Sequence, residues 1–141
     1  MALDTQLDKN SAIDFVDGIN RLLSGIKKNY HKWTNPDSVE GHIKDIKMKS
    51  IIDFNDSLNI KTGKKYTKVL QGNTVWGFIA NSDGVLKGIP YFKGDVFKPA
   101  GWKGPAKHTR GSIFDTNTNW FSWTGPNYLW GLLLVRNGLN V

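Results

Sequence analysis

Apolar residues recur at spacings of three and four along the first part of the chain, as they do on one side of an amphipathic helix. Ser11, with Asp14 three residues later, resembles a capping box and predicts a helix start near residue 11. Asn35-Pro36 predicts its end, because the residue before a proline disfavours the α conformation. We therefore predict one principal helix over about 11–34, whose apolar series is Ala12, Phe15, Val16, Ile19, Leu22, Leu23, Ile26, Tyr30 and Trp33.

From about residue 57 the pattern changes to short runs that are typical of strands and are separated by turn residues. Residues 57–71 indicate a hairpin that turns at Lys61-Thr62-Gly63-Lys64. TVWGFIA at 74–80 indicates a central strand, and further candidates lie at 94–97, 112–114 and 129–137. Residues 39–54 fit either a short helix or an irregular strand. We predict a single α+β domain over 1–141, with the principal N-terminal amphipathic helix packed on an antiparallel sheet.

The segment from Lys93 to Asp115 is rich in cations, glycine and proline, and we expect it to be a long basic loop. Proline fixes φ and glycine permits positive φ, so together they shape a loop whose cations and N–H groups converge on an anion. Six of its side chains are candidate anion ligands: Lys98, Trp102, Lys103, Lys107, His108 and Arg110.

A second basic patch consists of Lys64, Lys65 and Lys68, with Lys61 beside them. On a hairpin we expect Lys64 and Lys68 to share a face, with Lys61 in the turn and Lys65 opposite. If both patches face one way they form a groove. A charged edge strand that prevents aggregation is the alternative explanation.

Composition and charge favour a polyanionic partner. The 141 residues carry a net charge of +7 and no cysteine, which excludes disulfides and thiolate-ligated metals. No apolar run reaches the length of a membrane span, and MALDTQLDKN lacks the order of a signal peptide. We expect a protein that is neither secreted nor bound to a membrane.

The blocks KKYTKVLQGNTVWGFIA, GDVFKPAGWKGPAKHTRGSIFD and FSWTGPNYL resemble a family of small uncharacterised proteins of bacteriophages and large environmental viruses. The resemblance covers about Lys64 to Tyr128. It departs from the family at Gly101, Gly104 and Ser112, where the family more often has Ser, Ala and Asn. The resemblance implies a viral protein in the host cytoplasm or in the virion. It does not indicate which activity the protein has.

Arg110 offers a fork for phosphate, the lysines offer charge, and Trp102 offers a ring on which a base stacks. We therefore expect non-catalytic binding of nucleic acid or a nucleotide. The alternative is a braced loop in which Trp102 fills the core and Arg110 pairs with Asp115 or Asp95.

Enzymatic interpretations have weaker support. The three histidines, His31, His42 and His108, are far apart, and no nucleophile elbow or phosphate-binding loop motif occurs. We expect no catalytic residue, metal or cofactor. A minor alternative is a magnesium-dependent nuclease that uses Asp83, Asp95 and Lys98.

Five large aromatics follow near the end of the chain: Trp120, Phe121, Trp123, Tyr128 and Trp130. Such a set in a Gly-Pro segment completes the core or forms an exposed patch for another chain. It supports a second hypothesis, a virion structural protein or a host-directed inhibitor that binds protein partners or self-associates.

Overall fold

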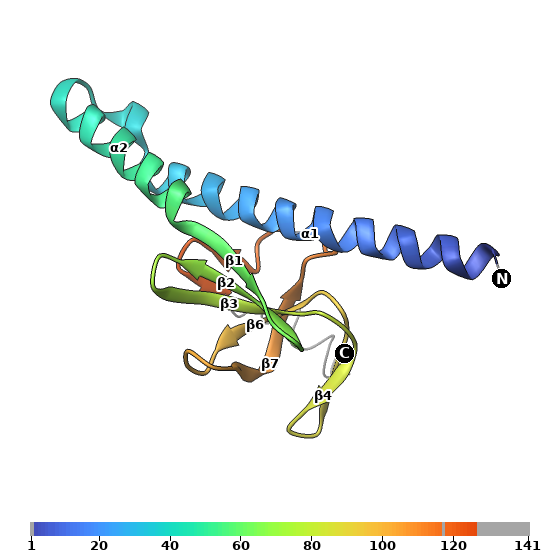
Figure 1. Cartoon of the computed structure of the whole chain (residues 1–141). Coiled ribbons are helices and arrows are strands. Elements are labelled where there is room, and N and C mark those ends of the chain that lie inside the picture. The colour runs from blue at the N-terminus through green and yellow to red at the C-terminus, as the bar shows by residue number, and fades with distance from the viewer. Residues whose placement is uncertain (1, 117, 127–141) are drawn as a thin grey trace, which may run out of the picture.

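A computed structural model describes residues 2–116 and 118–126, and side chains from Asp14 onward. It has the predicted α+β class: two helices and a five-stranded antiparallel sheet (Figure 1). The strand predicted at 129–137, together with Tyr128 and Trp130, lies outside the described residues. Within the described residues, no helix is both long and apolar enough to cross a membrane.

Helix α1 (Ala2–Thr34) is longer than the sequence predicts. Its C-terminal end is confirmed, since Asn35 turns to a φ of 50° immediately before Pro36. The predicted start at Ser11 is wrong, because helical backbone continues to Ala2. The intervening residues contain no proline or glycine to stop it. The helix spans roughly 50 Å at 1.5 Å per residue.

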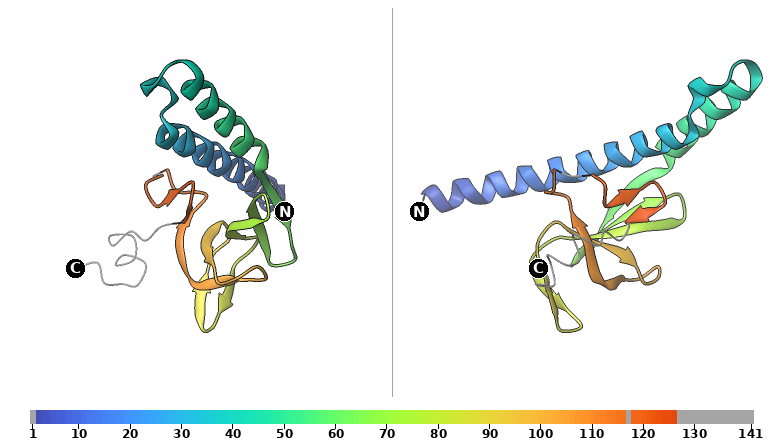
Figure 2. Two further views of the ribbon diagram at one scale, coloured as in Figure 1. Left: turned by 90° about the vertical axis from the view of Figure 1, so that its left-hand side faces the viewer. Right: turned by 180° about the vertical axis from the view of Figure 1, so that it is seen from behind.

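After Asn35 the chain makes a short 3-10 turn, η1 (Pro36–Ser38). The segment 39–54, which the sequence left open, then forms most of a second helix, α2 (Gly41–Ser57). Phe54 near the end of α2 stacks on Tyr30 of α1, with ring centroids 4.0 Å apart. Lys47 donates a hydrogen bond to the Thr34 carbonyl, with Nζ and O 2.9 Å apart. The two helices therefore form a hairpin that extends past the sheet (Figure 2).

The large sheet has the order β1-β2-β3-β6-β7, with every neighbouring pair antiparallel. The predicted hairpin and central strand are confirmed. The strands are β1 (Leu58–Thr62), β2 (Tyr66–Gln71), β3 (Thr74–Ala80), β6 (Asp95–Pro99) and β7 (Pro105–Ser112). Two small hairpins complete the fold: β4 (Gly84–Leu86) with β5 (Ile89–Tyr91), and β8 (Phe121–Ser122) with β9 (Gly125–Pro126).

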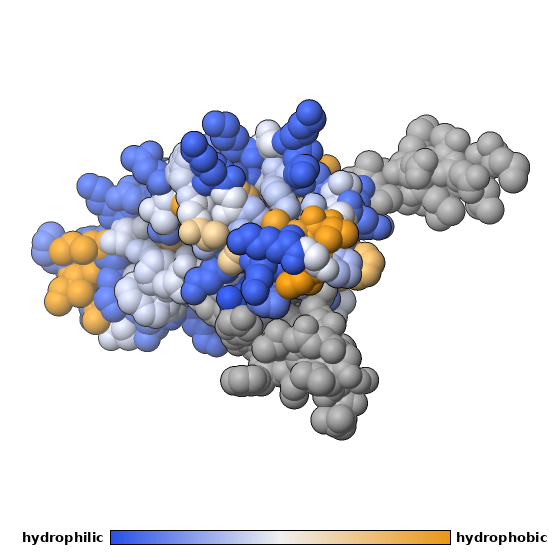
Figure 3. Space-filling model, turned by 90° about the horizontal axis from the view of Figure 1, so that it is seen from below, coloured by the Kyte–Doolittle hydropathy of each residue, from blue (hydrophilic) through white to orange (hydrophobic). Residues whose placement is uncertain are grey.

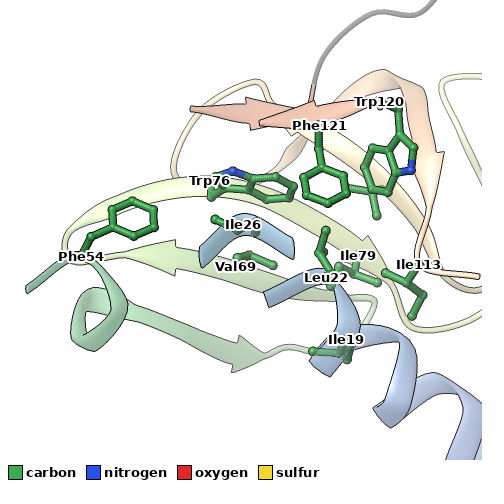
Figure 4. Close-up of a cluster of buried hydrophobic side chains, with 11 residues drawn as sticks. Ile19, Leu22, Ile26, Phe54, Val69, Trp76, Ile79, Ile113, Trp120 and Phe121 are labelled. Atoms are coloured by element: carbon green, nitrogen blue, oxygen red, sulfur yellow. The ribbon is translucent and has the colours of Figure 1, made fainter. Parts of the chain in front are cut away.

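The sheet separates two clusters of buried apolar side chains. Val69, Ile79 and Val96 share the larger cluster with the apolar side of α1 (Figure 4). Trp120 and Phe121 close this cluster, and the Trp76 indole N–H donates to the Ser122 carbonyl at 2.9 Å. Trp120 is 2% exposed, so it belongs to the core and not to a partner-binding patch.

The second cluster lies on the other face of the sheet, which we call the far face. Phe78, Ala80 and Phe97 alternate along their strands with residues of the larger cluster, so they point away from α1. Tyr91, at the end of the β4–β5 hairpin, covers them. One end of the far face is thus closed by this hairpin.

Candidate nucleic-acid interface

The basic segment 93–115 is a β-hairpin and not a long loop. β6 and β7 account for most of it and leave only residues 100–104 as the connecting loop. The Ala100 N–H donates to the Gly104 carbonyl at 3.0 Å. A Cβ at Gly101 or Gly104 would meet nothing within 4 Å, and neither residue has a positive φ. The loop is therefore shaped by strand pairing more than by its glycines.

The braced-loop alternative requires Trp102 to fill the core, and the structure contradicts this. Its side chain is 51% exposed. It lines an open pocket of about 220 Å³ with Val75, Pro99, Ala100 and Gly101. Lys68 from β2 places its Nζ 4.1 Å from the centroid of the Trp102 ring and 5.8 Å from that of Phe78. An ammonium held over an indole in this way is attracted by the negative face of the ring.

This contact brings the two predicted basic patches together. Lys68 pairs across the sheet with Phe78 on one side and with Lys61 on the other, so Lys61 and Lys68 both point to the far face. The predicted arrangement of the lysines is wrong in register: Lys61 lies in β1, while Lys64 and Lys65 lie in the turn between the strands. The turn is two residues further along the chain than the sequence suggested, since the Gly63 N–H donates to the Tyr66 carbonyl.

The remaining predicted side chains lie around this centre or away from it. Lys103 is exposed in the loop, and Lys107 is exposed on β7. Lys98 follows Phe97, so the alternation of β6 directs it to the face that α1 covers. Lys103 and Lys107 are therefore exposed near the loop, as Lys64 and Lys65 are in the turn, but Lys98 is not part of the far face.

Strand β7 is irregular where the other two candidates lie. Val96 pairs with Gly111 and Phe97 pairs with Thr109, which leaves Arg110 as the extra residue of a bulge. Arg110 and His108 are both half-buried. A bulge bends its strand and redirects side chains, so the fork of Arg110 lies in a less open setting than the sequence suggested.

The carboxylates of the segment 93–115 accept hydrogen bonds from backbone N–H groups. The N–H of Phe92 donates to Asp95 Oδ2 at 2.9 Å, and that of Ser112 to Asp115 Oδ2 at 3.1 Å. Asp83 Oδ1 accepts the Lys93 N–H at 2.8 Å. Among the side chains that the structure describes, no three His, Cys, Asp or Glu residues gather where they could hold a metal. The nuclease alternative gains no support from this geometry.

Tyr66 lies below the lysines on the far face. Burial, followed by its hydrogen bond with Tyr91, raises the pKa of Tyr66 from 10.0 to about 12. Its ring also meets Phe78 and Phe97 edge-on, with centroids 6.1 and 5.8 Å away. The phenol stays neutral at physiological pH, so it adds no negative charge beside the lysines.

Sequence reasoning missed one group of cations on α1. Arg21, Lys28 and Lys32 lie on the side of α1 opposite to its apolar series. Together with Thr118 and Phe121 these side chains line a cavity of about 530 Å³. Their spacings of seven and four residues were the available signal, but the opposing wall comes from a segment some 90 residues later.

Seen from below Figure 1, the molecule is mostly hydrophilic, with one group of apolar side chains at the end where α2 lies and a second group toward the opposite end (Figure 3). The far face offers the partly exposed indole of Trp102 beside the lysines Lys61 and Lys68. These are the groups with which proteins hold single-stranded nucleic acid, by stacking on bases and by neutralising phosphates.

Comparison with known proteins places the chain in a family. A family model described as a family of unknown function (DUF7717) matches residues 5–129. No curated protein and no solved structure matches the chain. Since the family model spans far more than half of the sequence, the protein belongs to the DUF7717 family of unknown function.

Proposed function

We propose that the protein binds nucleic acid without catalysis, through the far face of its sheet. The observation that carries the proposal is the contact between Lys68 and Trp102, with Nζ 4.1 Å from the ring centroid. It joins a basic hairpin to an exposed aromatic residue, and the sequence alone could not show that these two features meet. A viral origin, and a place in the host cytoplasm or virion, are part of the same proposal.

The arrangement of lysines supports an anionic ligand. Lys61 and Lys68 lie directly opposite each other on neighbouring strands. Like charges in this position destabilise a sheet. Among the described side chains no ion pair to a carboxylate offsets this repulsion. A phosphate placed between the two ammonium groups would turn the repulsion into attraction.

Single strands fit this face better than duplexes do. One side of the Trp102 ring holds the Lys68 ammonium, and the side chain remains 51% exposed. A base stacked on the exposed surface contributes roughly 1–3 kcal/mol, and stacking tolerates any sequence. Bases inside a duplex are already stacked on each other, so they are not available to stack on Trp102.

The test is fluorescence anisotropy of labelled single-stranded DNA and RNA at several salt concentrations. We expect Trp102→Ala to weaken binding about 5- to 150-fold with little change in salt dependence. We expect Lys61→Gln with Lys68→Gln to lower the slope of log affinity against log salt by about 1.4, since each neutralised phosphate contributes about 0.7.

The matched control is Lys44→Gln with Lys49→Gln, which removes the same charge from α2, away from the far face. It should reduce the slope much less than the far-face pair does. Equal effects of the two pairs would mean that only net charge matters. Absence of binding to any oligonucleotide at low salt would overturn the proposal.

One observation favours the second candidate function, a virion structural or host-interaction protein. Several large apolar side chains on the helical hairpin are exposed, with Trp33 at 65%, Ile43 at 57% and Ile52 at 55%. A group of this kind marks protein contact surfaces. Light scattering of the purified protein across a concentration series would show whether the hairpin mediates self-association.

A further inference from the structure

A second groove runs along α1, on the side of the molecule away from the far face. It is lined by α1 and by the segment that follows β7, and its volume is about 530 Å³. The lining residues from α1 include Arg21, Lys28 and Lys32, while Thr118 and Phe121 supply the opposite wall. Among the described residues, no acidic side chain lines this part of the groove. It is a site that the far-face proposal does not use.

The three cations lie along one line of the helix. At 3.6 residues per turn, Lys28 and Lys32 point within about 20° of the direction of Arg21. The line is about 16 Å long at 1.5 Å per residue. One strand of a nucleic acid presents a phosphate about every 3.4 Å along a duplex axis. The row of three cations is therefore longer than one phosphate group and matches the length of several consecutive phosphates.

Specific contacts between α1 and the segment after β7 shape the groove. A Cβ on Gly25 would lie 2.7 Å from the Phe121 ring, so only glycine lets the segment approach the helix this closely. The Trp123 N–H donates to Asn29 Oδ1 at 2.8 Å. Arg21 donates from Nη2 to the Ile113 carbonyl at 3.3 Å, which fixes its guanidinium at one end of the groove.

The charges in the groove are available to a ligand. Among the side chains that the structure describes, no ion pair links Arg21, Lys28 or Lys32 to a carboxylate. Ser24 and Thr118 place hydroxyl groups beside these cations, and hydroxyls commonly contact phosphate oxygens. Beyond Arg21 the adjoining hollow is lined by Asp14 and Asp17. Their charge repels a polyanion, so the groove binds it only from Arg21 toward Lys32.

We propose that this groove is a second phosphate-binding site, which holds the backbone of a nucleic-acid strand independently of the far face. The two sites lie on opposite sides of the sheet, so one molecule holds two strand segments at once. The claim that one molecule holds two strand segments rests on the proposed function of the far face. The claim that the groove binds phosphate does not rest on it.

The experiment compares four forms of the full chain: wild type, a far-face variant, a groove variant and their combination. The far-face variant carries Lys61→Gln, Lys68→Gln and Trp102→Ala. The groove variant carries Lys28→Gln and Lys32→Gln, which leaves the Arg21 contact with Ile113 intact. Its control is Lys27→Gln with Lys49→Gln, because neither of these residues lines the groove. Circular dichroism verifies that each form is folded.

Anisotropy with a labelled single-stranded oligonucleotide measures each site. We expect the far-face variant to retain salt-dependent binding and the combined variant to lose it. The groove changes should lower the salt slope by about 1.4, and the control pair should not. A groove variant that binds as wild type in both backgrounds would overturn the inference. A far-face variant that binds as wild type would overturn the proposed function alone.

A bridging assay tests the two segments on one molecule. An immobilised oligonucleotide with bound protein is exposed to a second, fluorescent oligonucleotide. Wild type should retain the second, fluorescent strand. For the far-face and the groove variants, the retained fluorescence should be at least tenfold lower than for wild type. Adenosine monophosphate serves as competitor in the anisotropy measurement on the far-face variant. If it displaces the labelled oligonucleotide at concentrations as low as an unlabelled oligonucleotide needs, the ligand is a mononucleotide and the proposal of a strand is wrong.

Discussion

Tyr66 shows how one residue connects the core of the far face to its surface. Its ring packs among Phe78, Tyr91 and Phe97, and Lys68 lies two residues further along the same strand. Alternation along β2 therefore gives Tyr66 and Lys68 the same face of the sheet. A substitution at Tyr66 tests the support under the lysines, and its ionisation offers a readout.

The raised pKa of Tyr66 predicts a loss of stability at high pH. The folded state keeps the phenolic proton up to about pH 12, while the unfolded chain releases it near 10.0. The folded state thus binds more protons between these values, so the free energy of unfolding falls as pH rises through this window. Below pH 10 this contribution is fully present. Urea unfolding at pH 9, 10 and 11 measures it.

Tyr66→Phe is the matched control for this titration. It removes the phenolic proton and the hydrogen bond with Tyr91 but keeps the ring. We expect the variant to be less stable at pH 8, by about 1 kcal/mol for the lost hydrogen bond. Its stability should then fall less steeply between pH 9 and 11 than that of wild type. Parallel slopes would show that other groups cause the alkaline loss.

Helix α2 is held against the rest of the molecule in part by the aromatic side chain of Phe54. Phe54 anchors α2 by stacking on Tyr30 and by meeting Trp123 edge-on, with centroids 5.9 Å apart. Phe54→Ala should cost about 3–5 kcal/mol, as expected for an aromatic side chain removed from a core. Ile46, on the same helix, is 52% exposed, and Ile46→Ala should change stability by less than about 0.5 kcal/mol. Urea denaturation followed by tryptophan fluorescence measures both. A small loss for Phe54→Ala would mean that α2 is not anchored through this contact.

At the level of elements, local rules predicted what local residues determine. Pro36 ended α1 where expected, and the turn residues near Gly63 predicted the first hairpin. Helix α2 was not resolved because its isoleucines fit two periods and its first half is largely exposed, so burial does not mark one side. The start of α1 was missed because a capping-box pattern occurs inside a continuing helix.

The site was predicted in its residue types but not in its arrangement. The sequence indicated Lys68 and Trp102, yet their contact joins residues on separate hairpins and depends on sheet order. Bulges in β7 changed the setting of Arg110, and no local pattern revealed them. The groove beside α1 was missed for a similar reason, because Phe121 and Thr118 reach the helix only through the tertiary fold.

For the whole molecule, the excess of positive charge predicts that a polyanion stabilises the folded state. The net charge is +7, and two basic regions lie on opposite sides of one sheet. A ligand that binds only the folded protein adds about 2.7 kcal/mol of stability at 100 times its dissociation constant. For a chain of this size that corresponds to roughly 5–10 °C in the unfolding temperature.

Thermal unfolding with a saturating single-stranded oligonucleotide measures this shift. The far-face and groove variants should each lose part of it, and the combined variant should lose nearly all of it. Raising the salt concentration should remove the shift in wild type, because counterion release then no longer favours binding. A shift that persists at high salt would indicate apolar association, and the exposed side chains of α2 would become the surface to investigate.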